Sequence, residues 1–417
     1  MKICGKHFIA VALISSLIVL GSVSCKTDDP VEEPAPEITE TKYYEDVKMT
    51  SYNFEYSSKD PYGKSVRLSG AITIGDEVTK DAPATGLFLY NHFTVYQKDE
   101  CPSHGDLMVQ KMLVGSGFIT ISADYYGFGS TEDKNQAYCI ANTNAQASVD
   151  ALLAAKKLLT SMGYTWNDVL FNAGYSQGGQ TTVAVVKYVT ENYPDIHFDW
   201  SFAGGGPYSI PLTYDTFISK PETEMPSTVI SVLLSYNEFY NLGFEFSQLF
   251  KEPLLSNIDE WFYSKKYTNG ELDQFLTTKL LTDYINEEAL NKESDIYKKF
   301  SAAMEKENLC SGWEPSKEEN IVIEHNESDN VVTVENARAL LKFFEDKGLS
   351  VSQHDENKDS GVIDYIDDFG DMTAFMNIGP HPWGALPFLV EIISHIQDLP
   401  GLKEFSPSEA AMMALIQ

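Results

Sequence analysis

The chain has 417 residues, 43% of them hydrophobic, so it can bury a core large enough for one sizeable domain with an insertion. Its 61 acidic residues outnumber its 30 lysines and arginines and give a formal net charge of −31, which argues against a nucleic-acid partner. The acidic residues are spread through predicted loops and helix faces. We therefore interpret the charge as an aid to solubility rather than as a binding site.

The N-terminus has the pattern of an export signal. Lys2 and Lys6 precede an apolar run over residues 8–20, which is too short to span a bilayer comfortably and leads through small residues to Cys25. Residues 1–24 are therefore predicted to be a secretory signal peptide. The stretch Ser22-Val-Ser-Cys25 resembles a bacterial lipobox, with Ser22 in place of the usual leucine. This resemblance implies that Cys25 is the lipidated first residue of the mature protein.

The segment after Cys25 predicts where the protein is displayed. Lys26-Thr-Asp28-Asp29 resembles the tag that certain Gram-negative bacteria use to carry lipoproteins to the outer surface. We therefore expect an outer-membrane lipoprotein, exposed on the cell and touching the membrane only through its lipid. Residues 25–45, rich in proline and acidic residues, are predicted to be a tether. Beyond the tether the chain has three cysteines, and a disulfide between Cys101 and Cys139 is one hypothesis.

The body of the chain predicts a sheet of about eight strands. Alternating or continuously apolar segments indicate strands over residues 49–57, 65–74, 85–90, 118–123 and 198–203, with others near residues 170, 321 and 350. A helix is predicted over residues 142–160 and another after residue 176. This order of strands and helices favours a mostly parallel sheet covered on both faces.

One segment of this body carries a nucleophile motif. Residues 169–187 read as a short buried strand, a turn containing Gly174-Tyr-Ser176-Gln-Gly178-Gly179, and a helix. A strand that reverses into a helix within three residues strains the backbone at the serine, and glycines are needed because larger neighbours would collide there. Ser176 is therefore predicted to be a nucleophile, with the backbone N–H of Gln177 ready to hold an oxyanion.

An orienting acid and a base follow the serine in the expected order. A strand over residues 319–325 leads into a turn that contains Asp329, and here the sequence resembles the α/β-hydrolase superfamily, whose triad acid follows a late strand in such a turn. Asn326 and Thr333 stand where glycine and proline are usual in that turn. The resemblance implies that Asp329 is the triad acid.

Three histidines are available for the base. His325 precedes the acid, and His354 lies in a strongly acidic loop. His381 lies in a loop punctuated by glycine and proline, with a helix expected to begin near Trp383. We therefore predict that His381 takes the proton of Ser176 while Asp329 holds its tautomer.

The resemblance also assigns the surroundings of the serine. The superfamily places a second oxyanion donor after its third strand, which points to the backbone of Phe93 or Thr94. It also inserts a helical cap before the acid strand. Residues 211–315, dense in aromatic side chains, match such a cap, which would roof the serine and form an apolar or aromatic pocket. The hydrolase core then comprises residues 46–210 and 316–417.

One acidic segment has some features of a metal site. The segment from Asp355 to Asp367 resembles a calcium loop with one residue inserted before its glycine. The insertion misplaces the sharp turn, so a solvated acidic loop is the preferred interpretation. No metal and no cofactor are expected.

The long cap, the Gly-Tyr-Ser-Gln-Gly-Gly turn and the export signal together resemble the secretory lipase and esterase group. This resemblance implies a carboxylic-ester hydrolase that acts through an acyl-enzyme. The aromatic residues of the cap favour a small-molecule ester with an apolar or aromatic moiety, and a monomer is expected. The alternatives are a serine peptidase of the prolyl-oligopeptidase type and a non-catalytic surface-binding lipoprotein. The sequence leaves open whether the ester is a lipid, an acylated glycan or a small aryl ester.

Overall fold

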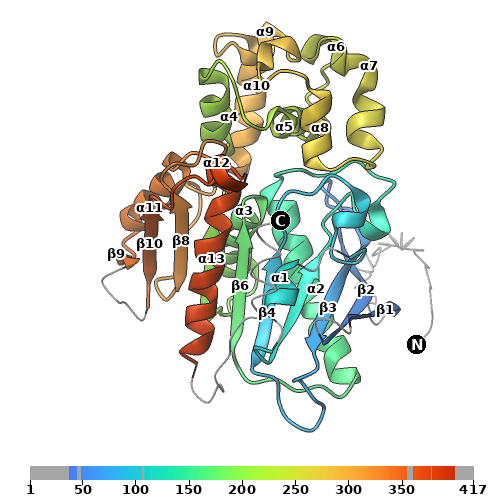
Figure 1. Ribbon diagram of the computed structural model, residues 1–417, viewed down its shortest axis with the longest axis vertical. Helices are drawn as coiled ribbons and strands as arrows, with labels where there is room; N and C mark the ends of the chain where they lie inside the picture. Colours follow the sequence, from blue (N-terminus) through green and yellow to red (C-terminus); the bar gives the residue numbers. More distant parts are fainter. Residues whose placement is uncertain are drawn as a thin grey trace, which may run out of the picture. The chain divides into compact units, whose positions relative to one another are not determined.

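The computed structural model describes residues 37–44, 48–105, 108–113, 115–354, 360–376 and 378–399, which belong to one compact unit (Figure 1). The predicted signal peptide, Cys25 and the export tag lie outside the described residues. None of the helices within the described ranges is both long and apolar enough to cross a bilayer.

A ten-stranded sheet forms the centre of this unit, in the order β1-β2-β3-β5-β4-β6-β7-β8-β10-β9. The first three strands and β5 pair antiparallel, and every pairing from β5 to β9 is parallel. Central strands such as β4 and β8 are buried along their whole length, as expected for a sheet covered on both faces. The strands are β1 (Glu37–Tyr44), β2 (Met49–Lys59), β3 (Ser65–Gly75), β4 (Gly86–Asn91), β5 (Phe118–Ala123), β6 (Leu170–Tyr175), β7 (Trp200–Gly204), β8 (Ile321–Asn326), β9 (Val351–Gln353) and β10 (Val362–Asp367).

The predicted α/β fold with a mostly parallel sheet is confirmed, but two strands were missed. Strand β1 occupies residues that the sequence analysis placed in the tether, and it pairs antiparallel with β2. Strand β10 lies inside the segment interpreted as an acidic loop, and it runs parallel to β8 with Val362 opposite Ile321. Of β10, only Val362 and Ile363 are buried, and β9 pairs with this strand only as far as Asp364. Its acidic second half therefore concealed the strand pattern.

Helices cover both faces of the sheet. Side chains of α2 (Ala141–Ser161), α3 (Gln177–Asn192) and α11 (Glu335–Asp346) share one hydrophobic cluster with one face. Side chains of α1 (Met108–Met112) and α13 (Pro380–Gln397) share a second cluster, rich in phenylalanine, with the other face. The short helix α12 (Thr373–Met376) precedes α13.

The chain between β7 and β8 forms a separate group of helices at one end of the sheet (Figure 1), which we call the cap. Many of its aromatic side chains are buried, which accounts for their density in the sequence. The cap contains α4 (Ile210–Ser219), α5 (Pro226–Phe239), α6 (Phe246–Leu249), α7 (Leu254–Ile258), η3 (Asp259–Tyr263), α8 (Asn269–Phe275), η4 (Leu281–Asp283), α9 (Glu287–Leu290), α10 (Asp295–Met304) and η5 (Glu305–Glu307).

The hypothesis of a disulfide between Cys101 and Cys139 is wrong. Both residues are buried free thiols, and Cys310 is also free. Burial raises the pKa of the Cys139 thiol to about 12, so it stays protonated.

Candidate active site

Ser176 lies at a sharp turn between a strand and a helix. Strand β6 ends at Tyr175 and α3 begins at Gln177, so Ser176 alone makes the connection, with φ 58° and ψ −121°. A positive φ is strained for a residue with a side chain and persists only where the surroundings enforce it. A Cβ atom at Gly178 would lie 2.2 Å from the carbonyl oxygen of Asn91, so only glycine lets the turn approach β4.

His381 links Ser176 to Asp329. Its Nε2 lies 2.9 Å from Ser176 Oγ, and its Nδ1 lies 2.6 Å from Asp329 Oδ2. Because a carboxylate only accepts hydrogen bonds, Nδ1 carries the proton and Nε2 accepts from the serine hydroxyl. The structure thus brings together all three residues of the predicted triad in one hydrogen-bonded chain.

His381 lies in the first turn of α13, which begins at Pro380 rather than near Trp383 as expected. Proline is favoured at the first position of a helix because the N–H that it lacks would have no partner there. The Gly-Pro-His-Pro stretch therefore starts the helix instead of extending the loop.

Asp329 is held as an acceptor by its own turn. Its Oδ1 accepts hydrogen bonds from the backbone N–H groups of Val331 and Val332, each at 2.9 Å. His325, which the sequence analysis set aside, lies beside it with Nε2 3.5 Å from Asp329 Oδ2. Burial lowers the pKa of His325, so its ring is neutral and donates from Nε2 to the carbonyl of Val332 at 2.7 Å. Asp329 therefore faces a neutral neighbour.

The predicted oxyanion donors border the same cavity as Ser176. Gln177 is the first residue of α3, where the helix dipole favours negative charge, and Phe93 and Thr94 follow β4. The preceding residue, His92, is buried and stacks on Tyr125 with ring centroids 4.0 Å apart. This stacking orders the loop that carries Phe93 and Thr94.

The cavity at Ser176 has a volume of about 370 Å³, within the range of small-molecule sites. Its cap side consists of residues from α4, α5 and the start of α8, and most of its lining is apolar. The side chains around the serine include Phe93, Ile210, Phe217, Met225, Val232, Val331, Val332, Pro382 and Ala385.

Most of the aromatic residues that marked the cap in the sequence do not line this cavity. Phe250 and Tyr236, for example, are fully buried elsewhere in the hydrophobic cluster of the cap. Within the described cap residues, Phe217 of α4 is the aromatic side chain that reaches the cavity. The cap walls above Ser176 therefore combine aliphatic side chains with threonines, and they include few aromatic side chains.

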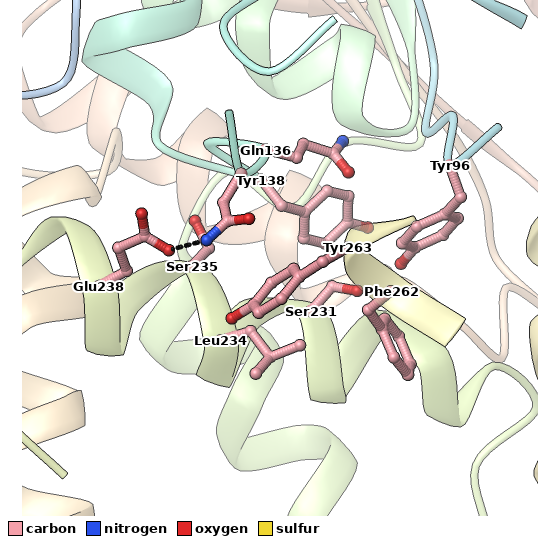
Figure 2. A pocket seen from close by; sticks show the side chains of 10 residues that line it. Tyr96, Gln136, Tyr138, Ser231, Leu234, Ser235, Glu238, Phe262 and Tyr263 are labelled. Carbon is pink, nitrogen blue, oxygen red and sulfur yellow. Dashed lines mark hydrogen bonds between the residues drawn. The ribbon is translucent and has the colours of Figure 1, made fainter. Parts of the chain in front are cut away.

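A second, much smaller cavity of about 20 Å³ lies where the cap meets the core (Figure 2). Figure 2 shows Ser231 of α5 on the side of Tyr138 and Tyr96 of the core, and Glu238 of α5 on the opposite side of the cavity. Glu238 accepts a hydrogen bond from Asn135 at 2.7 Å. This space is about one water molecule in size, so it marks the junction of cap and core rather than a substrate site.

Sequence reasoning missed one buried acid near the triad. Glu324 of β8 is completely buried, and neither of its carboxyl oxygens has a hydrogen-bond partner among the described residues. Burial, and secondarily the charge of Asp329, raises the pKa of Glu324 well above its ordinary value. The carboxyl group is therefore neutral. An acidic residue inside an otherwise apolar strand was the available signal.

The remaining candidates lie apart from the serine. His354 contacts Glu391 at 2.8 Å and stacks on Tyr365. Residues 355–359 of the calcium-like segment lie outside the described residues, and the described part of the chain contains no cluster of three or more metal-ligating side chains.

Comparison with known proteins decides the family. The model of the secretory lipase family matches residues 103–370, more than half of the chain. The chain belongs to the secretory lipase family. The match includes Ser176 and Asp329 and ends before His381. Membership indicates a secreted carboxylic-ester hydrolase. No curated protein matches the chain in sequence.

Solved structures of low sequence identity share the fold of this secretory lipase family member. A candidate hydrolase from Legionella pneumophila has 19% identity and a TM-score of 0.71, with 86% of this chain and 91% of that chain covered. The rice cell wall degrading esterase LipA from Xanthomonas oryzae has 18% identity and a TM-score of 0.70, with 88% and 97% covered. Candida antarctica lipase A in its closed state has 15% identity and a TM-score of 0.61, with 89% and 84% covered. All three likenesses support the α/β-hydrolase fold.

Proposed function

We propose that this secretory lipase family member hydrolyses esters through an acyl-enzyme on Ser176, with His381 as the base and Asp329 as the orienting acid. The observation that carries the proposal is the hydrogen-bonded chain from Ser176 Oγ through His381 to Asp329 Oδ2. That chain opens into a cavity of about 370 Å³. A hydroxyl aligned in this way can be activated as a nucleophile.

The contacts suggest the following order of steps. Ser176 Oγ attacks the ester carbonyl while His381 Nε2 takes its proton. The N–H of Gln177, with that of Phe93 or Thr94, would hold the oxygen that becomes negative. His381 then returns the proton to the departing alcohol, and a water molecule activated in the same way releases the acid. Asp329 holds the Nδ1–H of the ring and stabilises the charged imidazole.

The lining of the cavity supports an uncharged substrate with an apolar moiety. Ile210, Met225 and Val232 would contact the acyl or aryl group and exclude water from it. The neighbouring structures are an esterase that degrades rice cell wall and a lipase, so lipid, aryl and acylated-glycan esters are all to be compared. An aliphatic wall favours lipid-like esters over sugar acetates, and the family favours ester over peptide cleavage.

A substrate panel with a chemical label tests this function. The purified enzyme is assayed with p-nitrophenyl esters of rising chain length and with peptide anilides, and a fluorophosphonate is used to label the nucleophile. We expect ester turnover and one labelled serine, Ser176. Ser176→Ala should lose both, whereas Ser264→Ala in the cap should keep both. Anilide cleavage that exceeds ester cleavage, or a label on another serine, would contradict the proposal.

We further propose that the enzyme is a monomeric lipoprotein of the outer membrane, exposed on the cell surface and anchored only through Cys25. Its support is the charged and apolar N-terminus that leads to Cys25 and the Lys26-Thr-Asp28-Asp29 stretch. Family membership supports secretion without specifying an anchor.

A further inference from the structure

Tyr175 connects the nucleophile turn to the base. It is the last residue of β6 and directly precedes Ser176, and its hydroxyl donates to the backbone carbonyl of His381 at 2.6 Å. Its ring also packs against the His381 imidazole, with centroids 5.5 Å apart. The side chain of Tyr175 thus contacts the backbone of the base, and its backbone is bonded directly to that of the nucleophile.

Three glycines make room for this side chain. A Cβ atom at Gly384 of α13 would lie 2.4 Å from the Tyr175 hydroxyl. Cβ atoms at Gly204, the last residue of β7, and at Gly205 would lie 2.6 and 2.7 Å from atoms of its ring. Glycine within a helix is less stable than alanine. Gly384 therefore lowers the local stability of α13, but it leaves the space that the Tyr175 hydroxyl occupies.

The hydroxyl remains a donor throughout the working range of pH. Burial raises the pKa of Tyr175 far above its ordinary value, and the charge of Asp329 acts in the same direction. The phenol is therefore always protonated, and the His381 carbonyl is always available as its acceptor.

A parallel contact holds the neighbouring residue of the same turn. Asn326, at the end of β8, donates from Nδ2 to the carbonyl of Pro380 at 3.0 Å. The first turn of α13 is thereby tied to two strands, to β6 through Tyr175 and to β8 through Asn326. Only the tie through Tyr175 leads directly to the nucleophile.

We propose that Tyr175 is a positioning residue that sets the distance between His381 Nε2 and Ser176 Oγ. The proposal rests on the function proposed above. Small errors in the placement of a catalytic group reduce the rate of chemistry far more than they reduce substrate binding. Loss of the hydroxyl should therefore lower kcat and leave KM nearly unchanged.

The first test is Tyr175→Phe, with Tyr214→Phe as the matched control. Tyr214 is also buried and donates to a backbone carbonyl, that of Ala289 at 2.8 Å, but it does not line the Ser176 cavity. With p-nitrophenyl butyrate, we expect kcat of Tyr175→Phe to fall about ten- to a hundredfold with KM changed less than about twofold. Tyr214→Phe should retain the parent kcat. Equal kcat values for the two variants would overturn the proposal.

A double-mutant cycle shows whether the hydroxyl itself is responsible. Gly384→Ala should displace the Tyr175 hydroxyl and lower kcat on its own. This variant therefore tests the proposal even if Tyr175→Phe does not fold. Without the hydroxyl, the nearest atom to the new methyl group is the ring Cζ at 3.4 Å, an acceptable contact. The double variant should therefore be no slower than Tyr175→Phe.

The outcomes separate the two proposals. Additive losses in the cycle, or an unchanged kcat in Gly384→Ala, would overturn the role of Tyr175 while the parent enzyme still hydrolyses esters. A parent enzyme that neither hydrolyses the butyrate ester nor reacts with fluorophosphonate at Ser176 would instead overturn the proposed function.

Discussion

Lys265 of the cap donates a hydrogen bond to the backbone carbonyl of Glu132, 2.9 Å away, in the segment that follows β5. Its ammonium group also donates to the carbonyls of Gly127 and Lys134 and lies over the ring of Phe128, 5.4 Å from the centroid. The side chain is almost fully buried. One lysine therefore fastens the cap to a core loop.

Replacing this lysine should loosen the cap. Lys265→Met would leave three carbonyl groups without their donor, at a cost of about 2–3 kcal/mol in the free energy of unfolding. Urea unfolding measures the difference. Lys266→Met is the control, because Lys266 is exposed and pairs with Glu260 on the surface. Equal stability of the two variants would contradict a fastening role for Lys265.

The stability difference between the parent and Lys265→Met should depend on pH. Burial lowers the pKa of Lys265 from 10.5 to about 8. Between these values the unfolded chain binds the proton and the folded chain does not, so the contribution of this group to stability rises with pH across that window and is lost as pH falls towards 8. The stability difference between the parent and Lys265→Met should therefore widen from pH 8 to pH 10. A difference that is constant with pH would contradict this assignment.

Glu324 should make the protein less stable as pH rises. Its folded pKa lies well above the ordinary value of 4.5, so its contribution is fully present below pH 4.5 and is lost as pH rises towards the folded pKa. Glu324→Gln removes the titration and should gain stability relative to the parent between pH 5 and pH 8, with activity retained. Thermal melting across this range measures the gain. Glu318→Gln, on the exposed loop before β8, should show none.

The hydrogen bonds that link Ser176, His381 and Asp329 predict a different loss of kcat for each substitution. His381→Ala should reduce kcat about as much as Ser176→Ala, on the order of a millionfold, because the groups act as a unit. Asp329→Asn should cost about 10⁴-fold, since the geometry survives while the tautomer is lost. Steady-state kinetics with a p-nitrophenyl ester measures each loss. His354→Ala should leave the chemical step unchanged, and a near-normal rate in Asp329→Asn would point to another acid.

The aliphatic wall predicts the preferred acyl length. Each methylene buried in the cavity contributes about 0.8 kcal/mol, nearly fourfold in efficiency, until the cavity ends. Val232→Phe on α5 should fill part of the space and move the optimum of kcat/KM to shorter esters. Val390→Phe, at an exposed site on α13, should leave the profile unchanged. A profile that is flat in the parent enzyme would reject the lipid-like pocket.

The anchor can be tested separately from the chemistry. Cys25→Ser should release a soluble and fully active enzyme from the membrane fraction, because lipid chains hold through about 0.8 kcal/mol per buried CH₂. Cell fractionation with an activity assay measures the release. Protein that remains with the membrane would place the anchor elsewhere. Alanines at Lys26, Asp28 and Asp29 should retain the lipid and stop proteases from reaching the protein on intact cells.

The amino-acid sequence by itself determined the features that depend on neighbouring residues. The glycines around Ser176 and the strand and helix on either side indicate the turn because its steric requirements are local. The order of serine, acid and histidine then selected Asp329 and His381, and in the structure His381 contacts both Ser176 and Asp329. Apolar runs predicted the buried strands for the same local reason.

Only the tertiary structure decided which side chains meet across long stretches of chain. Tyr175 and His381 are 206 positions apart, and Lys265 lies 133 positions from Glu132. No local pattern encodes such contacts, because they arise when β6, α13, the cap and the core loops pack together. Packing also buried Glu324 without a hydrogen-bond partner among the described residues, and it turned most cap aromatics away from the cavity. These outcomes depend on which other elements cover each face of a helix or strand. Hydrophobic periodicity predicts that a face is buried, but it does not predict which element packs against it.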